Sequence, residues 1–423
     1  MAAAVSALLL VGLASIYVTD THYVAGHDGP RNAERQCAYI AISLSFAALI
    51  LHIGYQALAS RAKAMFILGI LLLVPLAVAP LLHTSFGGLT PPRNGAYRWI
   101  QLPGLQLQPS EFVKLFYVLA LASYLKYRRD YRQFRGLLVP VLLSAIPLVL
   151  ILVEPDLGTV LLLIPVLFAM LFVAGARISH LAILVLLGLA VAPLAWSGIR
   201  GYQRARVTAV LLQSETLRQA VIHDPQRYSL LATKRQAIEW AASSGYQLVH
   251  SKNAIGSGGV WGNGWGEGVY ATQSILPDRH NDFIFAVVAH QFGFLGCCCV
   301  LLCYLLIVAA GVRIAANTDE PTGRLLSTGL VTLLASQAVV NIGMATGLMP
   351  TTGMTLPFVS HGGSSLLSSF AAIALLVSVS QHRPFLLEAK PFEFTRGDRP
   401  VSHPAEHPRR TAPGASVQDV GAR

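Results

Sequence analysis

The sequence predicts an all-α polytopic membrane protein that crosses the bilayer about ten times. Of its 423 residues, 54% are hydrophobic and 12% are charged, whereas a soluble domain carries roughly 25% charged residues. Apolar windows such as 137–153 and 159–175 approach the ~20 residues that a helix needs to cross a hydrocarbon core. One long polar stretch, residues 198–281, predicts a large extracytoplasmic loop between the seventh and eighth helices.

Ten apolar segments are predicted as transmembrane helices. They cover residues 2–19, 36–55, 64–83, 111–125, 136–153, 159–175, 179–197, 283–311, 325–346 and 363–381. The first segment has no small-residue cleavage site, so it is interpreted as a span and not as a signal peptide. The five cysteines lie in apolar runs without metal-ligand spacing, which predicts packing roles.

The distribution of Lys and Arg predicts the orientation. One set of short loops holds most of these residues, and the positive-inside rule assigns those loops and both termini to the cytoplasm. Residues 84–110, 198–281 and 347–362 are then outside. This topology explains the net charge of +11, so nucleic-acid binding is not inferred. Residues 383–423 are predicted to be a disordered cytoplasmic tail behind a membrane domain of residues 1–382.

The first outer segment, "RWIQLPGLQLQPSEFVKL", leads into a helix. Ser110 is predicted as its N-cap, and an acid at Glu111 suits the first turn. Glu111 and Lys114 lie three residues apart on one face, so we expect them either to pair or to contact a lipid-borne substrate. Arg98 offers a fork of donors for a phosphate, and Trp99 offers a flat face for a sugar ring.

The short outer turn "EPDLGT" places two carboxylates between apolar helices. Glu154 and Asp156 are candidate ligands of a divalent cation, magnesium or manganese. The alternative is structural, because Asp156 is placed to cap the helix that follows. No organic cofactor is expected.

Two glycine-rich outer segments can gather backbone N–H groups. Seven glycines between residues 256 and 268 predict either a flexible loop or an anion-binding nest near Lys252. The last predicted helix starts at "HGGSS", where N–H and hydroxyl groups either face an anion or only cap the helix. The residues concerned are Gly362, Gly363, Ser364 and Ser365.

The stretch "LPDRHNDFIF" puts Asp282 at the threshold of the eighth predicted helix. An ionisable group at membrane depth is costly unless it is solvated, paired or functional. Asn281 is expected to cap this helix, and Asp282 is predicted to be functional, with a first-turn acid as the alternative. His290, two turns further on, is predicted to be a buried, hydrogen-bonded histidine.

Together these stretches resemble the SEDS (shape, elongation, division and sporulation) family, typified by RodA and FtsW. Five motifs occur in the family's order between about residues 94 and 382. They are "RWIQLPGLQLQPSEFVKL", "EPDLGT", "YQLVHSKNAIGSGG" with "GNGWGEG", "LPDRHNDFIFAVVAHQFGFLG" and "NIGMATGLMPTTGMTLPFVSHGGSS". The motifs "YQRARV" and "GNGWGEG" favour RodA, and hence cell elongation and shape over division.

The resemblance implies a ten-helix peptidoglycan glycosyltransferase of the cytoplasmic membrane. Such an enzyme polymerises lipid II, a disaccharide pentapeptide linked to undecaprenyl diphosphate, on the outer face and releases undecaprenyl diphosphate. A class B penicillin-binding protein, a transpeptidase, is the implied partner, with other elongation or division proteins. The essential acid of the family corresponds to Asp282, which is expected to be the general base.

The resemblance also implies that the outer polar positions form a substrate cavity. The implied substrate-binding residues are Arg98, Trp99, Glu111, Lys114, Lys252, Gly362, Gly363, Ser364 and Ser365, with Glu154 and Asp156 beside them. The chain departs from the family where relatives often have two acids, here His290 and Gln291. It also has Asn281 for a common Thr and His361 for a usual Tyr.

The main alternative function is a lipid II flippase. A flippase needs an alternating-access path, typically with charges near the midplane, whereas the polar features of this sequence gather on one face. An O-antigen ligase or polymerase is a third alternative, whose motif order fits poorly.

Overall fold

The computed structural model describes most of the chain up to the last predicted helix. The described residues are 1–21, 32–82, 90–91, 97–102, 105–126, 133–198, 201–229, 231–273 and 275–381. The predicted cytoplasmic tail, residues 383–423, lies outside them.

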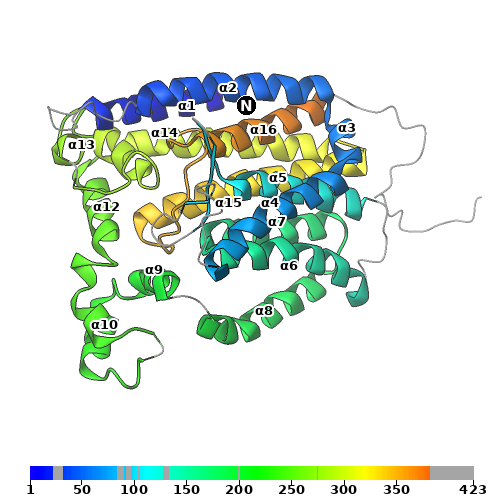
Figure 1. Ribbon diagram of the computed structural model, residues 1–423. Coiled ribbons are helices and arrows are strands. Elements are labelled where there is room, and N and C mark those ends of the chain that lie inside the picture. Colours follow the sequence, from blue (N-terminus) through cyan, green and yellow to red (C-terminus); the bar gives the residue numbers. More distant parts are fainter. Residues whose placement is uncertain are drawn as a thin grey trace, which may run out of the picture. The chain divides into compact units, whose positions relative to one another are not determined.

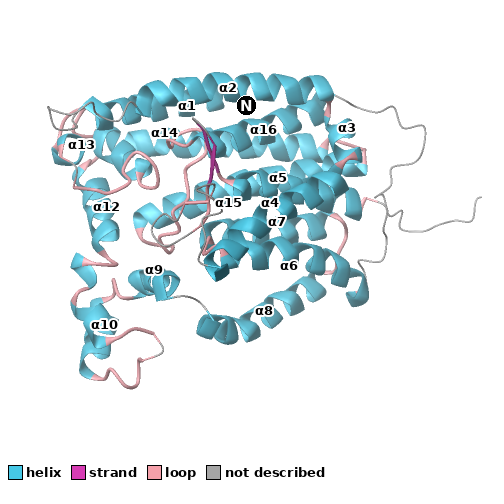
Figure 2. Cartoon of the chain, in the orientation of Figure 1, coloured by secondary structure: helices cyan, strands magenta, loops and turns pink. Residues whose placement is uncertain are grey.

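The structure confirms the predicted all-α architecture, because each of the ten predicted spans corresponds to a helix (Figures 1 and 2). These helices are α1 (Ala2–Thr21), α2 (Asn32–Ile53), α4 (Ala62–Leu82), α5 (Pro109–Leu125), α6 (Leu138–Val153), α7 (Leu157–Val173), α8 (Ile178–Gly198), α14 (Ile284–Ala316), α15 (Pro321–Thr346) and α16 (Gly363–Gln381). Among the described residues, seven helices are long and apolar enough to cross a membrane, and α7 and α8 contribute shorter apolar stretches.

Shorter elements fill the connections. They are α3 (Tyr55–Ser60), the antiparallel strands β1 (Ile100–Leu102) and β2 (Leu105–Leu107), the 3-10 helices η2 (Phe134–Leu137) and η3 (Trp240–Ala242), and the loop helices α9 (Gly201–Leu211), α10 (Glu215–His223), α11 (Lys234–Ile238), α12 (Tyr246–Ser257) and α13 (Val269–Thr272). In Figure 1, α9, α10, α12 and α13 gather at one end of the helix bundle.

Helix α15 is the centre of the bundle and packs against α14, α7, α5 and α16. Small residues allow this close packing. A Cβ added to Gly329 of α15 would lie 2.5 Å from Val118 Cγ1 of α5, and one added to Gly311 of α14 would lie 2.1 Å from Val331 Cγ2 of α15. Such contacts hold helices together in lipid, where apolar burial alone provides little drive for association.

The long connection between α8 and α14 has a small core of its own. Trp240 is buried there with Leu212, Val221 and Leu248, and its Nε1 donates a hydrogen bond to the Ala209 carbonyl at 2.9 Å. Helix α12 is fixed to the bundle as well, because Ser251 Oγ donates to the Ala345 carbonyl of α15 at 2.7 Å. The loop is therefore a folded cap attached to one end of the bundle.

Helix α14 is broken at Gly293, whose φ of 62° and ψ of −160° are not helical. The glycine-rich loop after α12 closes this break. The N–H groups of Asn263 and Gly264 donate to the carbonyls of His290 and Gln291 at 3.0 and 3.1 Å. After the break, the N–H groups of Phe294 and Leu295 donate to the carbonyls of Gly259 and Val260, at 2.9 and 3.2 Å. Each half of α14 thus receives the caps that a helix end requires.

These contacts favour a structural role for the glycine-rich segment over the predicted anion nest. The N–H groups of Asn263 and Gly264 point to helix carbonyls. His290 lies beneath the same loop, where its Nδ1 shares a hydrogen bond with Ser257 Oγ at 2.8 Å, and only 2% of the residue is exposed. The prediction of a buried, hydrogen-bonded histidine is confirmed.

We predict that Gly262→Ala destabilises the protein, whereas Gly256→Ala does not. Gly262 has φ +84°, and a Cβ there would lie 2.1 Å from the Gln291 carbonyl oxygen, so strain of about 1–3 kcal/mol is expected. Gly256 lies inside α12 with open space around it, where Ala favours the helix. Thermal unfolding in detergent, followed by tryptophan fluorescence, compares the two variants. Equal melting temperatures would contradict the proposed closure of the break.

Candidate active site

Asp282 lies in the turn immediately before α14, and buried neighbours fix its position. Phe283 and Ile284 are almost completely buried. Asn341 of α15 reaches this turn, where its Nδ2 donates to the Asp282 carbonyl at 3.0 Å and to the Met354 carbonyl at 2.5 Å. The half-buried Asp282 carboxylate is thereby held at the rim of the bundle.

Asn281 does not cap α14, which corrects the prediction made from sequence. The N-cap position is Phe283, and no side chain bonds the helix start there. The backbone instead makes a tight turn in which the N–H groups of Asn281 and Phe283 donate to the Asp278 carbonyl, at 3.0 and 3.4 Å. Asp282 lies within this turn, between the two residues whose N–H groups donate to Asp278.

Charged groups of both signs surround the Asp282 carboxylate. A Cβ placed on Gly353 would lie 3.5 Å from Asp282 Oδ2 and 3.3 Å from Arg206 Nη1, so both side chains face this glycine. Burial raises the pKa of Asp282 to about 7, helped by Asp278 and opposed by Arg206 and Arg98. A carboxyl group with such a pKa is present in both protonation states at neutral pH.

Arg98 attaches its segment to the turn between α6 and α7. Its Nε donates to the Glu154 carbonyl at 3.2 Å, and its Nη2 donates to the Pro155 carbonyl. Glu154 is buried, and its Oε1 has no hydrogen-bond partner among the described residues. Burial, then the charge of Asp156, raises the pKa of Glu154 well above its usual value, against the effect of Arg98.

Asp156 caps α7, as the structural alternative predicted. Its carboxylate accepts from the Thr159 N–H at 3.3 Å and from Thr159 Oγ1 at 2.9 Å. Ser110 Oγ and Gln108 Nε2 also donate to it, each at 3.3 Å. Ser110 was predicted to cap its own helix, but the N-cap of α5 is Gln108, and Ser110 bonds Asp156 instead.

A cation site at Glu154 and Asp156 fits this arrangement poorly. Both oxygens of Asp156 already accept hydrogen bonds. Within the described ranges, no group of three His, Cys, Asp or Glu residues could hold a metal ion. The divalent cation stays a prediction, and no step of the proposed reaction depends on it.

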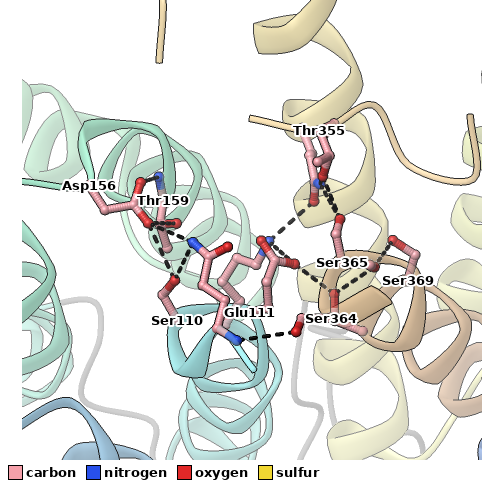
Figure 3. A network of polar contacts seen from close by, with 12 residues as sticks. Ser110, Glu111, Asp156, Thr159, Thr355, Ser364, Ser365 and Ser369 are labelled. Carbon is pink, nitrogen blue, oxygen red and sulfur yellow. Dashed lines mark hydrogen bonds and ion pairs between the residues drawn. The ribbon is translucent and has the colours of Figure 1, made fainter. Parts of the chain in front are cut away.

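Glu111 and Lys114 form a buried ion pair (Figure 3). Lys114 Nζ lies 2.9 Å from Glu111 Oε2, and the lysine is only 2% exposed. Gln337 Oε1 accepts from the same ammonium at 3.3 Å, while Ser368 Oγ donates to Glu111 at 2.8 Å. Because partners inside the bundle satisfy both charges, the observed arrangement is the ion-pair alternative. Their predicted contact with substrate stays a prediction.

The "GGSS" run joins this polar network at the start of α16 (Figure 3). Ser364 Oγ accepts from the Gln108 N–H at 3.1 Å and donates to the Gln106 carbonyl at 3.2 Å. Ser365 Oγ shares a 2.5 Å hydrogen bond with Thr355 Oγ1. These hydroxyls connect α16 to the β2–α5 segment and to the last outer segment. Gly362 and Gly363 precede them, and a Cβ at Gly363 would press on the Tyr39 ring.

Two predicted binding residues lie outside this network. Lys252 is exposed on α12, and its Nζ donates to Gln213 Oε1 at 3.3 Å, beside Gly347. Trp99 is half-buried immediately before β1. No described contact joins either side chain to Asp282.

His361 contacts the Asp282 turn from the opposite side. Its N–H donates to the His280 carbonyl at 3.0 Å, and the two imidazole rings meet edge to face at 6.0 Å. Burial lowers the pKa of His361 to about 4, assisted by His280 and Arg35. Its ring is therefore neutral at physiological pH and packs against Tyr39 of α2 at 5.8 Å.

Arg206 of α9 is the site residue that sequence reasoning missed. It occurs in "YQRARV", a motif that favours RodA but does not by itself single out Arg206. The available signal is an arginine on a helix within a long segment rich in charge. Nothing in the local pattern indicates that α9 folds back to Asp282.

Comparisons with known proteins agree with this architecture. A sequence model of the FtsW/RodA/SpoVE family, described as cell cycle protein, matches residues 1–384. A probable peptidoglycan glycosyltransferase FtsW of Geobacter metallireducens is 35% identical over 84% of this chain and 86% of its own length. The peptidoglycan glycosyltransferase MrdB of Escherichia coli is 32% identical over the same shares, 84% and 86%.

Solved structures give the same result at the level of the fold. A chain from a structure described as "Structural coordination of polymerization and crosslinking by a peptidoglycan synthase complex" matches with a TM-score of 0.68 and 28% identity, covering 90% of this chain and 97% of that one. The rod shape determining protein RodA of Thermus thermophilus matches with a TM-score of 0.61 and 26% identity, covering 90% and 95%. The chain belongs to the FtsW/RodA/SpoVE family of multi-pass membrane proteins, the SEDS family that its motifs resemble.

Proposed function

We propose that this chain is a peptidoglycan glycosyltransferase that polymerises lipid II, with Asp282 as its general base. The single observation that carries the assignment is the half-buried Asp282 carboxylate at the rim of the bundle, with a pKa of about 7. Membership in a family whose relatives are named peptidoglycan glycosyltransferases supports the reaction class. A base with a pKa near the working pH combines a useful ionised fraction with proton affinity.

The reaction is a displacement at a sugar carbon. A hydroxyl oxygen of one lipid-linked saccharide forms a bond to the anomeric carbon of another. The bond from that carbon to the diphosphate oxygen breaks, and its electron pair leaves with undecaprenyl diphosphate. Asp282 accepts the hydroxyl proton as the new bond forms, so charge and atoms balance without a co-reactant.

The positive charges of arginines near Asp282 complement the negative charge of the diphosphate leaving group. Arg206 faces the same glycine as Asp282, and Arg98 also acts on its pKa. A guanidinium group binds phosphate oxygens with a planar fork of donors, and cations fixed where negative charge develops lower the barrier. Arg98 is additionally held by the carbonyls of Glu154 and Pro155, which limits its movement.

A lipid II flippase is less well supported than the enzyme. The described polar groups around Asp282 gather at the end of the bundle that carries the loop helices, which suits chemistry on one face. Purified protein in vesicles with lipid II separates the two functions. A ladder of glycan strands supports the enzyme, and transfer of lipid II between leaflets without polymer would support the flippase.

Topology and partners follow from the same proposal. Both termini are placed in the cytoplasm, with the loop helices outside, because the basic short loops define the inner side.

A class B penicillin-binding protein is the proposed partner. This partner is supported by the similarity of the chain to one chain of a peptidoglycan synthase complex, whose structure is described as coordinating polymerization and crosslinking. The motif "YQRARV" favours an elongation role.

We predict that Asp282→Asn abolishes polymerisation without destabilising the protein. Loss of a general base should lower the rate about 10²- to 10⁴-fold. The pKa of Asp282 is raised in the folded state, so its ionisation opposes folding above its unfolded pKa. The Asp282→Asn variant should therefore unfold at a temperature equal to or higher than that of wild type at pH 8. Gel analysis of glycan strands and thermal unfolding test both parts, and wild-type polymer from the variant would refute the assignment.

The pH dependence should follow the ionisation of the same carboxyl. A base must be deprotonated, so kcat/KM is expected to rise with pH up to about 7 and then to level off. Below that pH the rate should fall about tenfold per pH unit. Initial rates between pH 5 and 9 measure the profile, and a midpoint near pH 4 would contradict a half-buried base.

Replacing Arg206 should change both the rate of polymerisation and the midpoint of the pH profile of kcat/KM. Arg206→Gln removes a charge that holds the pKa of Asp282 down, so the midpoint should move to higher pH. It should also reduce kcat/KM about 10²-fold, because one donor to the leaving group is lost. Arg206→Lys keeps the charge but not the fork, so the midpoint should return while the rate recovers only in part. An unchanged midpoint in Arg206→Gln would exclude this role.

A further inference from the structure

A polar cavity of ≈ 680 Å³ opens beside Asp282 in the folded outer loop. Its walls come from α9, α11, the start of α12, the turn before α14 and the last outer segment. Arg206 and Asp278 line it, and both also act on the pKa of Asp282. The volume is within the ~300–1,000 Å³ typical of small-molecule sites. The cavity therefore lies next to charged groups that surround Asp282.

The lining of this cavity carries both signs of charge. Arg235 and Glu239 of α11 line one wall and form an exposed pair, with Nε and Oε1 3.0 Å apart. Arg206 and Asp278 supply a second cation and a second anion. Between these charged groups, uncharged polar side chains such as Gln247 provide donors and acceptors. No aromatic side chain is among its described lining residues.

This lining suits only one part of a lipid-linked saccharide. A prenyl chain requires a continuous apolar groove, whereas every described lining residue of this cavity except Ala205 carries a polar or charged side chain. A diphosphate would be repelled by Asp278 and Glu239. A disaccharide is uncharged and would use the hydrogen-bonding groups of this lining but not its charges. A short peptide carries carboxylates, an amine and amide groups, which match arginines, acids and a glutamine amide.

We propose that this cavity binds the peptide of the lipid-linked substrate while its sugar lies at Asp282. The inference rests on the proposed function, because it names the substrate portion held next to that site. It makes Arg235 and Glu239 specificity-determining residues for a charged peptide. Neither residue belongs to the group that surrounds the Asp282 carboxylate.

The wall that carries these two residues is well fixed. A capping box begins α11, in which the Thr233 N–H donates to Gln236 Oε1 at 2.9 Å and the Gln236 N–H donates to Thr233 Oγ1 at 3.3 Å. After η3, Gly245 lies directly under the Trp240 ring, where a Cβ would come within 2.3 Å of a ring carbon. A rigid wall reduces the ordering cost of binding a flexible peptide.

The test compares two substrates in the full-length protein. One is lipid II, and the other is the same lipid after an amidase has removed its peptide. KM is measured for both with wild type, Arg235→Gln and Glu239→Gln. Arg227→Gln is the matched control, because Arg227 is exposed in the same loop and does not line the cavity. Melting temperatures confirm that each variant is folded.

We expect Arg235→Gln to raise KM for lipid II about fivefold relative to its KM for the peptide-free lipid, as for the loss of one exposed charge contact. Arg227→Gln should leave the ratio of the two KM values at the wild-type level. Equal increases on both lipids would assign the cavity to the sugars or the diphosphate and overturn the proposal. No increase on either lipid would overturn it too.

A second measurement does not require turnover of the peptide-free lipid. Free stem pentapeptide, added to wild type polymerising lipid II, should inhibit competitively, and Arg235→Gln should weaken that inhibition. Absence of inhibition would refute peptide binding while leaving the enzyme assignment intact. Failure of wild type to polymerise lipid II would instead refute the proposed function, so the two failures are distinguishable.

Discussion

Within hydrocarbon, every backbone donor and acceptor needs a partner inside the protein, and the outer half of α14 is built on this constraint. Gly293 breaks the helix, and such a break would leave N–H and carbonyl groups of α14 without their helical partners. The loop that follows α12 supplies the missing partners. The short first segment of α14, which begins just after Asp282, is thereby fixed at both ends. This closure acts together with Asn341, which holds the Asp282 turn from α15.

Hydrogen bonds from side chains to backbone carbonyls extend this principle to the rest of the site. Asn341 joins α15 to the Asp282 turn, and Arg98 joins its segment to the turn after α6. Ser364 Oγ joins α16 to β2, where it donates to the Gln106 carbonyl. Each bond satisfies an acceptor that lies outside a regular helix, and each brings a distant segment toward one point. The electrostatics of Asp282 follow from that convergence, since its charged neighbours come from four separate parts of the chain.

The sequence alone predicts those features that depend on local pattern. Hydropathy indicates the ten helices, and the acid at the start of the eighth helix is anomalous enough to indicate Asp282. The cap at Asp156 also follows from spacing. Features that depend on packing are not predictable in this way. The pairing of Lys114 with Glu111 follows from their spacing, but their burial does not, because only the folded bundle brings Gln337 to Lys114 and Ser368 to Glu111.

Arg206 shows the same limit more strongly. Its place beside Asp282 depends on the path of a loop of more than eighty residues, and no short motif encodes that path. The same limit applies to the glycines between 256 and 268. The reason why a glycine is required becomes clear only in the structure, where Gly262 contacts the backbone of α14. Local pattern predicts that such residues are unusual, but the reason lies in a contact with a remote segment.

The departure from the family at His290 and Gln291 is consistent with the closed break. Both residues are almost completely buried beneath the glycine-rich loop, and His290 makes its hydrogen bonds with Ser257 and Asn263 of that loop. A buried carboxylate in either position would lose hydration without a cation among these partners. It would also add negative charge to the helix that follows Asp282, and such charge raises the pKa of a carboxyl group. Neutral polar side chains there limit the desolvation cost, and the pKa of Asp282 remains set by its burial and then by Asp278, Arg206 and Arg98.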